Sequence, residues 1–331
     1  MNGRSIGNIL ILLGLGAGLI AVPFTLSTFY IQLIYVVFMF VALSASWNIL
    51  GGYTGYISFG HVVFFGMGGY TTAILASRLG LSPFLTVPAG ALIAVLVSLL
   101  IGFPTLRLRS SYFVIATLGV GAVFQLLALN LSFLTNGADG IVLRLPPWNV
   151  RTVRQVFYGI MLAVATIVVL VNYKIENSKF GLALMSIRED EDAAETMGLN
   201  TYRLKLLTLA ISAFFTGLTG GIHACAVPFI QPLSTFDPSI SVSLVLMCIL
   251  GGLGSYLGAV LGATLLKLLS ELLHYTVASE LSMVIYGLLL LIMISFRPDG
   301  LVGLLETMGL GVRRSKFEIR SEEIITSRDV P

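Results

Sequence analysis

The stretch GGYTGYISFGH, residues 51–61, places four glycines, several hydroxyl-bearing side chains and a histidine between two long apolar runs. Glycine allows turns that other residues forbid, and it lets neighbouring helix backbones approach closely. Inside a membrane, irregular backbone is tolerated only where protein encloses it or where it lines a cavity. We therefore expect an unwound segment between two helices here, with hinge or packing glycines at Gly51, Gly52, Gly55 and Gly60.

The composition of the whole chain is that of an integral membrane protein. Hydrophobic residues make up 56% of the 331 residues and charged residues 11%, and the mean hydropathy is +0.96. A soluble domain carries charge on about a quarter of its residues, whereas a spanning helix needs about 20 mostly apolar ones. Such runs follow one another from residue 6 to residue 296. The predicted fold is an all-α, polytopic membrane helix bundle.

The apolar runs predict about ten membrane spans. They cover residues 6–26, 28–50, 56–77, 84–105, 112–134, 155–173, 205–226, 240–252, 256–273 and 281–296. Helix breaks near Gly51 and Gly251 could lie at membrane depth, which gives a range of eight to ten full spans. Fourteen of the 19 basic residues fall on the side of the two termini and four on the other, so both termini are expected in the cytoplasm. The expected domains are a membrane domain, 1–297, and a cytoplasmic tail, 298–331.

The segment KIENSKFGLALMSIREDEDAAETMGLNTYRLK, residues 174–205, is too polar to enter the bilayer and is expected to be a cytoplasmic loop. Ser186, followed three residues later by Glu189, forms a capping box, and Gly198 is placed to end the helix in the left-handed conformation. These signals predict one short helix over about 187–197. A helix of this length is marginal by itself, so it must pack on the membrane domain or on another protein. A solvated acidic helix that joins two spans fits the same signals.

Several function classes lack their sequence signals. The chain contains no G-x-x-x-x-G-K-[ST] loop, so it is not expected to bind ATP, and its scattered histidines and cysteines predict no metal site. The sequence contains no recognisable pattern of a nucleophile and a base, so we do not predict an enzyme. The charge distribution does not indicate nucleic-acid binding. Glu271 is the one plausible carboxylate within a span, and Lys267 must either snorkel to the membrane surface or find a partner such as Glu271, one helical turn on.

Several motifs resemble one family of membrane proteins. The sequence DAAETMG, residues 192–198, resembles the E-A-A-x-x-x-G loop of ABC importer permeases, with Asp in the first place and without the Leu-Pro that often follows. The longer SIREDEDAAETMGLN is similar to the corresponding loop of the LivM-type permeases of branched-chain amino-acid importers. Further similar stretches are GGYTGYISFGHVVFFGMGGYTTAIL (51–75), LRLRSSYFVIATLG (106–119), LTNGADGI (134–141) and LGGLGSYLGAVLGA (250–263).

The resemblance implies a permease subunit of an ABC importer for branched-chain or other hydrophobic amino acids in a bacterial or archaeal cytoplasmic membrane. The implied partners are a homologous permease forming a heterodimer, two cytoplasmic ATPase subunits that use ATP and Mg²⁺, and an external solute-binding protein. No cofactor is implied for this chain itself. The residues implied in ATPase coupling are Ser186, Glu189, Asp192, Ala193, Ala194 and Gly198.

Polar side chains of the opening stretch are candidates for the translocation pathway, because an unwound segment leaves backbone groups free for a zwitterionic solute. Ordinary helix packing explains the same residues. The candidates are Tyr53, Thr54, Tyr56, Ser58 and His61, with Gln125 in a later span, and a second hinge or packing cluster is Gly251, Gly252 and Gly254.

Three alternatives to the amino-acid importer remain open from the sequence. Permeases for urea or short-chain amides resemble this family. An ion-coupled secondary amino-acid carrier would need no ATPase partner. A membrane scaffold would use the acidic loop only to recruit another protein.

Overall fold

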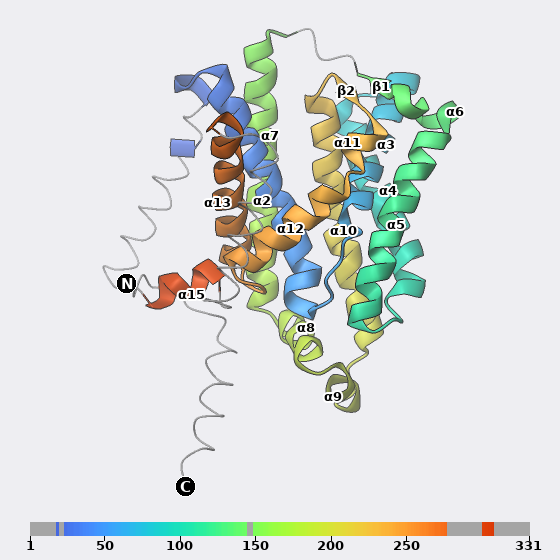
Figure 1. Ribbon diagram of the computed structural model, residues 1–331, viewed down its shortest axis with the longest axis vertical. Helices are drawn as coiled ribbons and strands as arrows, with labels where there is room; N and C mark the ends of the chain where they lie inside the picture. Colours follow the sequence, from blue (N-terminus) through green and yellow to red (C-terminus); the bar gives the residue numbers. More distant parts are fainter. Residues whose placement is uncertain (1–17, 20–22, 144–147, 277–299, 308–331) are drawn as a thin grey trace.

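A computed structural model describes residues 18–19, 23–143, 148–276 and 300–307, and it is a helical bundle (Figure 1). Within these residues, eight helical segments are long and apolar enough to cross a membrane, in agreement with the predicted all-α polytopic class. Most of the span expected over 6–26, the whole span expected over 281–296 and the tail beyond residue 307 lie outside the described residues. The long helices are α2 (Thr28–Thr54), α3 (His61–Leu79), α4 (Pro83–Thr105), α5 (Ser110–Asn130), α7 (Val150–Glu176), α10 (Thr201–Ala226), α12 (Pro238–Gly251) and α13 (Tyr256–Thr276).

Shorter elements connect the spans. They are α6 (Ser132–Thr135), η1 (Gly137–Asp139), β1 (Ile141–Val142), α8 (Lys179–Glu189), α9 (Glu191–Thr196), β2 (Phe229–Ile230), α11 (Pro232–Thr235) and α15 (Gly300–Thr307). Strands β1 and β2 pair in antiparallel fashion, with Ile141 opposite Ile230, and they join the loop that follows α5 to the loop that follows α10. The β-ribbon lies at one end of the bundle, and α8 and α9 lie at the other, which we call the α9 end (Figure 1).

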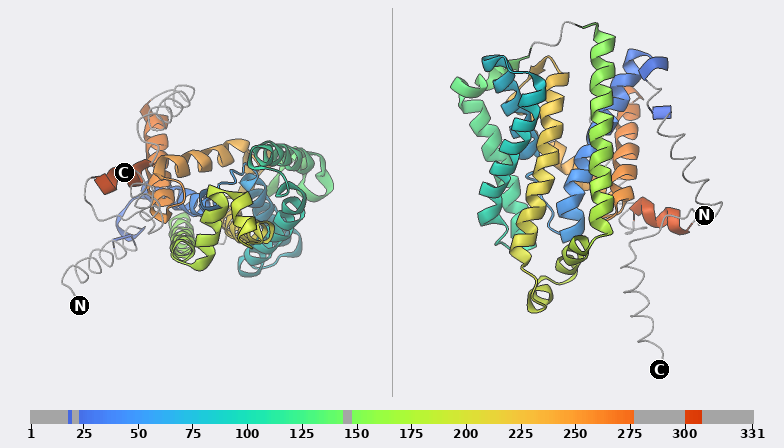
Figure 2. Two further views of the ribbon diagram at one scale, coloured as in Figure 1. Left: turned by 90° about the horizontal axis from the view of Figure 1, so that it is seen from below. Right: turned by 180° about the vertical axis from the view of Figure 1, so that it is seen from behind.

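Helix α2 is the centre of the bundle. Helices α7 and α13 pack on it, and α10 connects it to a second group formed with α3 and α4 (Figure 2). In α2, 72% of the most apolar window is buried, whereas in α5, at the outer edge, only 22% is buried. A helix that is apolar on every side is stable only when it is enclosed by protein or lipid. The surface of α5 is therefore open to lipid or to a partner.

Backbone-to-backbone contact between α3 and α10 depends on glycine. A methyl group added at Gly68 would lie 2.0 Å from the carbonyl oxygen of Gly217, and one added at Gly217 would lie 2.4 Å from the Cβ of Ala94 in α4. Lipid tails are as apolar as the helices, so close packing rather than the hydrophobic effect holds such helices together. These two glycines set the spacing of α3, α4 and α10.

The structure corrects the prediction for residues 51–61. Gly51 and Gly52 are helical, and α2 ends only at Gly55, whose φ is +73°. The helix expected to begin at residue 56 begins at His61, so residues 55–60 form an irregular segment that leads back from the α9 end toward the bundle interior (Figure 1). Gly51 and Gly52 are required for packing: a Cβ there would lie 2.3 Å from the Trp47 ring and 1.9 Å from the Asn48 amide oxygen.

The second glycine cluster does break the chain, as expected. Helix α12 ends at Gly251. The φ values of Gly252 and Gly254 are +117° and +77°, and α13 begins at Tyr256. The two glycine clusters meet, because a Cβ on Gly52 would lie 2.9 Å from the nitrogen of Gly254. The sequence does not predict this contact between segments some 200 residues apart.

Of the two possibilities for Lys267, the structure shows the ion pair with Glu271. Lys267 Nζ lies 3.0 Å from Glu271 Oε1, one helical turn along α13. The same ammonium lies 5.1 Å from the centre of the Phe40 ring in α2. A carboxylate and an aromatic face thus offset the cost of placing this charge in a span.

Candidate functional site

Residues 178–198 form two short helices rather than the single helix predicted over 187–197. Ser186 is not an N-cap, because it lies inside α8 and its hydroxyl donates to the carbonyl of Leu182 at 3.0 Å. Glu189 is the last residue of α8. The cap of α9 is Asp190, which is extended and accepts a hydrogen bond from the nitrogen of Ala193 at 2.9 Å. Several capping residues compete in this segment, and the longer run of α8 leaves Ser186 in a helix interior.

The predicted stop at Gly198 is confirmed. Its φ is +87°, and the nitrogen of Leu199 donates to the carbonyl of Ala194 at 3.1 Å, which closes the last turn of α9. A side chain in this conformation is strained, so the position favours glycine. The chain then enters α10 with Asn200 as its cap, accepting from the nitrogen of Arg203.

Helix α9 has one face packed on the bundle and one face directed outward. Ala194 is only 4% exposed and packs in a cluster with Tyr53 and Ile187. Asp192 and Ala193 are exposed, and Met197 is 86% exposed. A methionine at the tip of a short helix suits a binding surface, because its flexible side chain adapts to a partner. Among the predicted residues, Asp192 and Ala193 therefore lie on the outward face and Ala194 does not.

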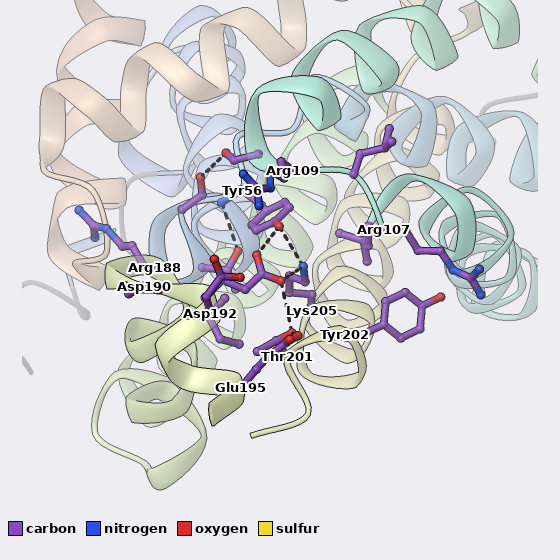
Figure 3. Close-up of a pocket in the computed structure, with 17 residues that line it drawn as sticks. Tyr56, Arg107, Arg109, Arg188, Asp190, Asp192, Glu195, Thr201, Tyr202 and Lys205 are labelled. Carbon is purple, nitrogen blue, oxygen red and sulfur yellow. Dashed lines mark hydrogen bonds and ion pairs between the residues drawn. The ribbon is translucent and has the colours of Figure 1, made fainter. Parts of the chain in front are cut away.

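A cluster of polar side chains connects α9 to the rest of the bundle (Figure 3). Glu191 Oε2 accepts a hydrogen bond from the hydroxyl of Tyr56 at 2.5 Å, and Glu191 Oε1 forms an ion pair with Lys205. Lys205 also donates to the Tyr56 hydroxyl at 2.9 Å. Thr201 donates to Glu195 at 2.5 Å and lies 3.3 Å from Glu191. The loop between α2 and α3, helix α9 and the first turns of α10 are thus joined.

The electrostatics of the cluster favour the ionised carboxylate. Burial acts to raise the pKa of Glu191, but the bonds from Lys205, Tyr56 and Thr201 outweigh burial and lower that pKa below its ordinary value of 4.5. Burial and the adjacent carboxylate together raise the pKa of Tyr56 well above its ordinary value. Lys205 and Thr201 are not among the residues that the sequence singles out. A basic residue in the early turns of an apolar span is the signal that could have found Lys205.

A cavity of about 780 Å³ opens beside this cluster at the α9 end. Its walls include the turn between α4 and α5, the end of α8, helix α9 and the start of α10. Both acidic and basic side chains line it. Arg107 lies over the ring of Phe103 at 4.6 Å and near Tyr202 at 5.8 Å, so it is held by aromatic faces. The charged residues lining the cavity are Arg107, Arg109, Arg188, Lys205, Asp190, Glu191, Asp192 and Glu195.

The irregular segment 55–60 is held by side chains from two helices. The indole nitrogen of Trp47 in α2 donates to the carbonyl of Ser58 at 2.7 Å, and the nitrogen of Phe59 donates to the hydroxyl of Thr117 in α5 at 3.1 Å. The Ser58 hydroxyl accepts from the nitrogen of Gly60. These bonds from α2 and α5 hold the segment in a defined conformation.

His61 begins α3 in the bundle interior. Its Nε2 lies 2.7 Å from the hydroxyl of Ser212 in α10, and that hydroxyl donates to the carbonyl of Ser46. Since the Ser212 proton is committed to Ser46, Nε2 is the protonated nitrogen of His61. The adjacent cavity, lined by Ser58 and other residues, has a volume of about 10 Å³, so it has no room for an amino acid in this conformation.

The remaining predicted pathway residues do not gather around His61. The Tyr53 hydroxyl lies 3.2 Å from the carbonyl of Asn172 in α7, and the Thr54 hydroxyl donates to its own helix at Leu50. The amide of Gln125 lies 3.4 Å from the carbonyl of Leu233 near the other end of the bundle. Only Ser58 and His61, of the predicted set, share one interior region.

Comparison with known families identifies the kind of protein that carries this arrangement. A model of the family described as branched-chain amino acid transport system / permease component matches residues 10–294. The chain belongs to this family. It is therefore a multi-pass permease component of the cytoplasmic membrane and not itself an enzyme.

Individual relatives of the permease agree with the family match. It is 30% identical to the high-affinity branched-chain amino acid transport system permease protein LivM of Escherichia coli (strain K12), over 91% of this chain and 76% of the relative. It is 29% identical to the probable branched-chain amino acid transport permease protein LivH of Methanocaldococcus jannaschii, over 72% of this chain and 80% of the relative. It is also 29% identical to the nucleoside ABC transporter permease protein NupC of Lactococcus lactis subsp. cremoris, over 58% of this chain and 63% of the relative. No solved structure matches the chain.

Proposed function

We propose that this permease translocates branched-chain or other hydrophobic amino acids into the cell, driven by ATP hydrolysis in separate subunits. The observation that carries the proposal is the similarity to the E. coli LivM permease over 91% of the chain. The similarity to the nucleoside permease covers 58% of the chain, which favours the amino-acid substrate class. The cavity at the α9 end and the closed interior around His61 suit a carrier that opens to one side at a time.

The proposed topology has ten spans, with both termini and the α9 end in the cytoplasm. It adds spans over 6–26 and 281–296 to the eight described segments. Basic residues support this orientation, because they are more frequent at the α9 end than at the β-ribbon end among the described residues. The α9-end residues are Arg107, Arg109, Lys174, Lys179, Arg188, Arg203 and Lys205, and those at the other end are Arg78, Arg151 and Arg154.

The proposed assembly contains a second, related permease, two ATPase subunits that bind ATP and Mg²⁺, and an external solute-binding protein. The occurrence of LivM-named and LivH-named relatives supports the second permease. Helix α9 is the proposed coupling element. Asp192, Ala193 and Met197 form its docking face, Gly198 ends it, and Ala194 anchors it to the membrane domain.

The proposed translocation pathway passes near Ser58 and His61. Both are buried in the interior at the start of α3, and Gly60, Gly252 and Gly254 lie at chain breaks where helices can change their relative angle. Opening this region requires a change in the packing of α5 or α12, because Thr117 of α5 binds Phe59 of the irregular segment and Ser241 of α12 binds Val62 in the first turn of α3.

The test is reconstitution of the complete importer. The permease is purified from its native membrane under gentle conditions, the co-purifying subunits are identified, and the complex is placed in proteoliposomes with its binding protein. ATP-dependent uptake of leucine, isoleucine or valine is the expected result. Uptake of urea, short-chain amides or nucleosides in place of these amino acids would reject the substrate class. Uptake by the permease without any ATPase would reject the importer mechanism in favour of an ion-coupled carrier.

A further inference from the structure

Side-chain hydrogen bonds connect α9 to the membrane domain at only two residues, within the part of the chain that the structure describes. Glu195 binds Thr201, at the first turn of the next helix. Glu191 binds Lys205 and also Tyr56, which belongs to the irregular segment before α3. Glu191 is therefore the residue whose side-chain bonds join α9 to a part of the bundle far from it in sequence, among the described residues.

Tyr56 stands at the outer end of a segment that reaches the interior. Its ring packs edge-on against Phe113 of α5, with 5.4 Å between the ring centres. Three residues later, the nitrogen of Phe59 binds Thr117 on the same helix. The segment then passes directly into α3 at His61, whose following residue binds the Ser241 hydroxyl of α12. A displacement of Tyr56 is thus transmitted to the contacts of α3 with α5 and α12.

Lys205 binds both of the other two residues. Its side chain is 3% exposed and that of Glu191 30%, and its ammonium lies 4.3 Å from the centre of the Tyr56 ring. A buried ammonium is stable only when carboxylate, hydroxyl or aromatic groups satisfy it. If α9 moved away without Tyr56, the Lys205 ammonium would lose its carboxylate partner. The three side chains therefore move together.

We propose that Glu191, Lys205 and Tyr56 form a polar joint that converts displacement of α9 into movement of the segment leading to His61, an inference that rests on the proposed function. Tyr56 and Lys205 are positioning residues in this joint. They do not bind ATP or solute; they determine whether the motion of α9 reaches the interior.

The experiment compares transport with ATP hydrolysis in the complete importer in proteoliposomes. Tyr56→Phe keeps the ring and its packing on Phe113 and removes only the hydroxyl. We expect the number of amino acids taken up per ATP hydrolysed to fall about tenfold, corresponding to the coupling energy of one contacting pair. ATPase assembly and the rate of hydrolysis should stay within about twofold of the wild type.

The matched control is Tyr202→Phe. Tyr202 lines the same cavity, but its hydroxyl donates to the carbonyl of Phe103 in α4 at 3.0 Å. This variant should keep the wild-type ratio of uptake to hydrolysis. An equal loss in both variants would reject the joint, since any hydroxyl in the cavity would then have the same effect.

A double-variant cycle tests whether the residues act as one unit. Glu191→Gln by itself and Glu191→Gln combined with Tyr56→Phe should lower the ratio to the same extent, because either change opens the joint. Fully additive losses, or a Tyr56→Phe protein with the wild-type ratio, would overturn the proposal. If the wild-type complex itself shows no ATP-dependent amino-acid uptake, the proposed function fails instead, and this outcome is distinct from failure of the joint.

Discussion

The amide oxygen of Asn48 in α2 accepts a hydrogen bond from the backbone nitrogen of Gly254 at 3.1 Å, although 206 residues separate the two. The amide nitrogen of Asn48 donates to Asn172 Oδ1 in α7 at 3.2 Å and to the carbonyl of Ser255 at 3.3 Å. One fully buried side chain thus joins the central helix to α7 and to the turn between α12 and α13. This turn is held in place by a polar bond and not only by apolar packing.

Replacing Asn48 with leucine is expected to destabilise the permease by about 3 kcal/mol, because it leaves buried partners on Asn172, Gly254 and Ser255 unsatisfied. The measurement is denaturant unfolding of the purified protein in detergent. Asn130→Leu is the control, since the exposed Asn130 amide donates to the carbonyl of Leu126 in its own helix, and its effect should stay within about 0.5 kcal/mol. Equal effects of the two changes would contradict the structural role of Asn48.

Gly217→Ala is expected to lower the free energy of unfolding by about 2 kcal/mol, because the new methyl group overlaps the Cβ of Ala94 and forces α10 away from α4. Gly119→Ala, in α5, is the control. A Cβ at Gly119 has no neighbour within 4 Å, so this change should be neutral or slightly stabilising through helix propensity. Thermal unfolding in detergent measures both, and a stable Gly217→Ala protein would show that these helices can separate without cost.

Ala193→Trp is expected to weaken binding of the ATPase subunits at least tenfold while leaving the permease folded, because Ala193 lies on the exposed face of α9. Ala194→Trp places the same ring into the buried cluster around Tyr53 and should destabilise the permease itself by about 2 kcal/mol. Co-purification of the ATPase and the unfolding temperature separate the two effects. If Ala193→Trp leaves ATPase binding intact, α9 does not dock in the proposed orientation.

The contribution of ionised Glu191 to the stability of the folded protein is expected to be lost in acid. Because the pKa of Glu191 lies below its ordinary value of 4.5 in the folded protein, its contribution is fully present above about pH 4.5 and is lost as the pH falls through the lowered pKa. The unfolding temperature of the wild type minus that of Glu191→Gln should therefore be constant from neutral pH to about pH 5 and shrink in stronger acid. In a Lys205→Met background this difference should be much smaller. A difference that grows on acidification would contradict the assignment.

The apolar runs determined the existence and order of the spanning helices. The structure places α4 at Pro83–Thr105 and α13 at Tyr256–Thr276, close to the expected 84–105 and 256–273. Hydrophobic length and the need to satisfy every backbone group within the bilayer are local properties, so they can be read from composition along the chain. The stop at Gly198 and the ion pair of Lys267 with Glu271 were likewise predictable, since each depends on neighbours within one helical turn.

Other features depended on contacts that composition does not encode. Gly51 is helical although glycine by itself suggests a break, and the Trp47 ring occupies the space that a side chain at residue 51 would need. Ser186 lost its predicted capping role because α8 begins earlier, at the competing cap Ser178. In both cases the local signal was present, and packing or a neighbouring helix decided between two locally acceptable structures.

By itself, the sequence determined a polytopic helical permease and the place of its polar loop. Only the tertiary structure decided which side chains of that loop face outward and which hold it to the bundle, as with Ala193 and Ala194. It also decided that Glu191 meets Lys205 and Tyr56. The physical reason is that a membrane bundle brings together residues from distant helices through close packing and buried polar bonds, and a linear pattern of hydrophobicity carries no information about those pairings.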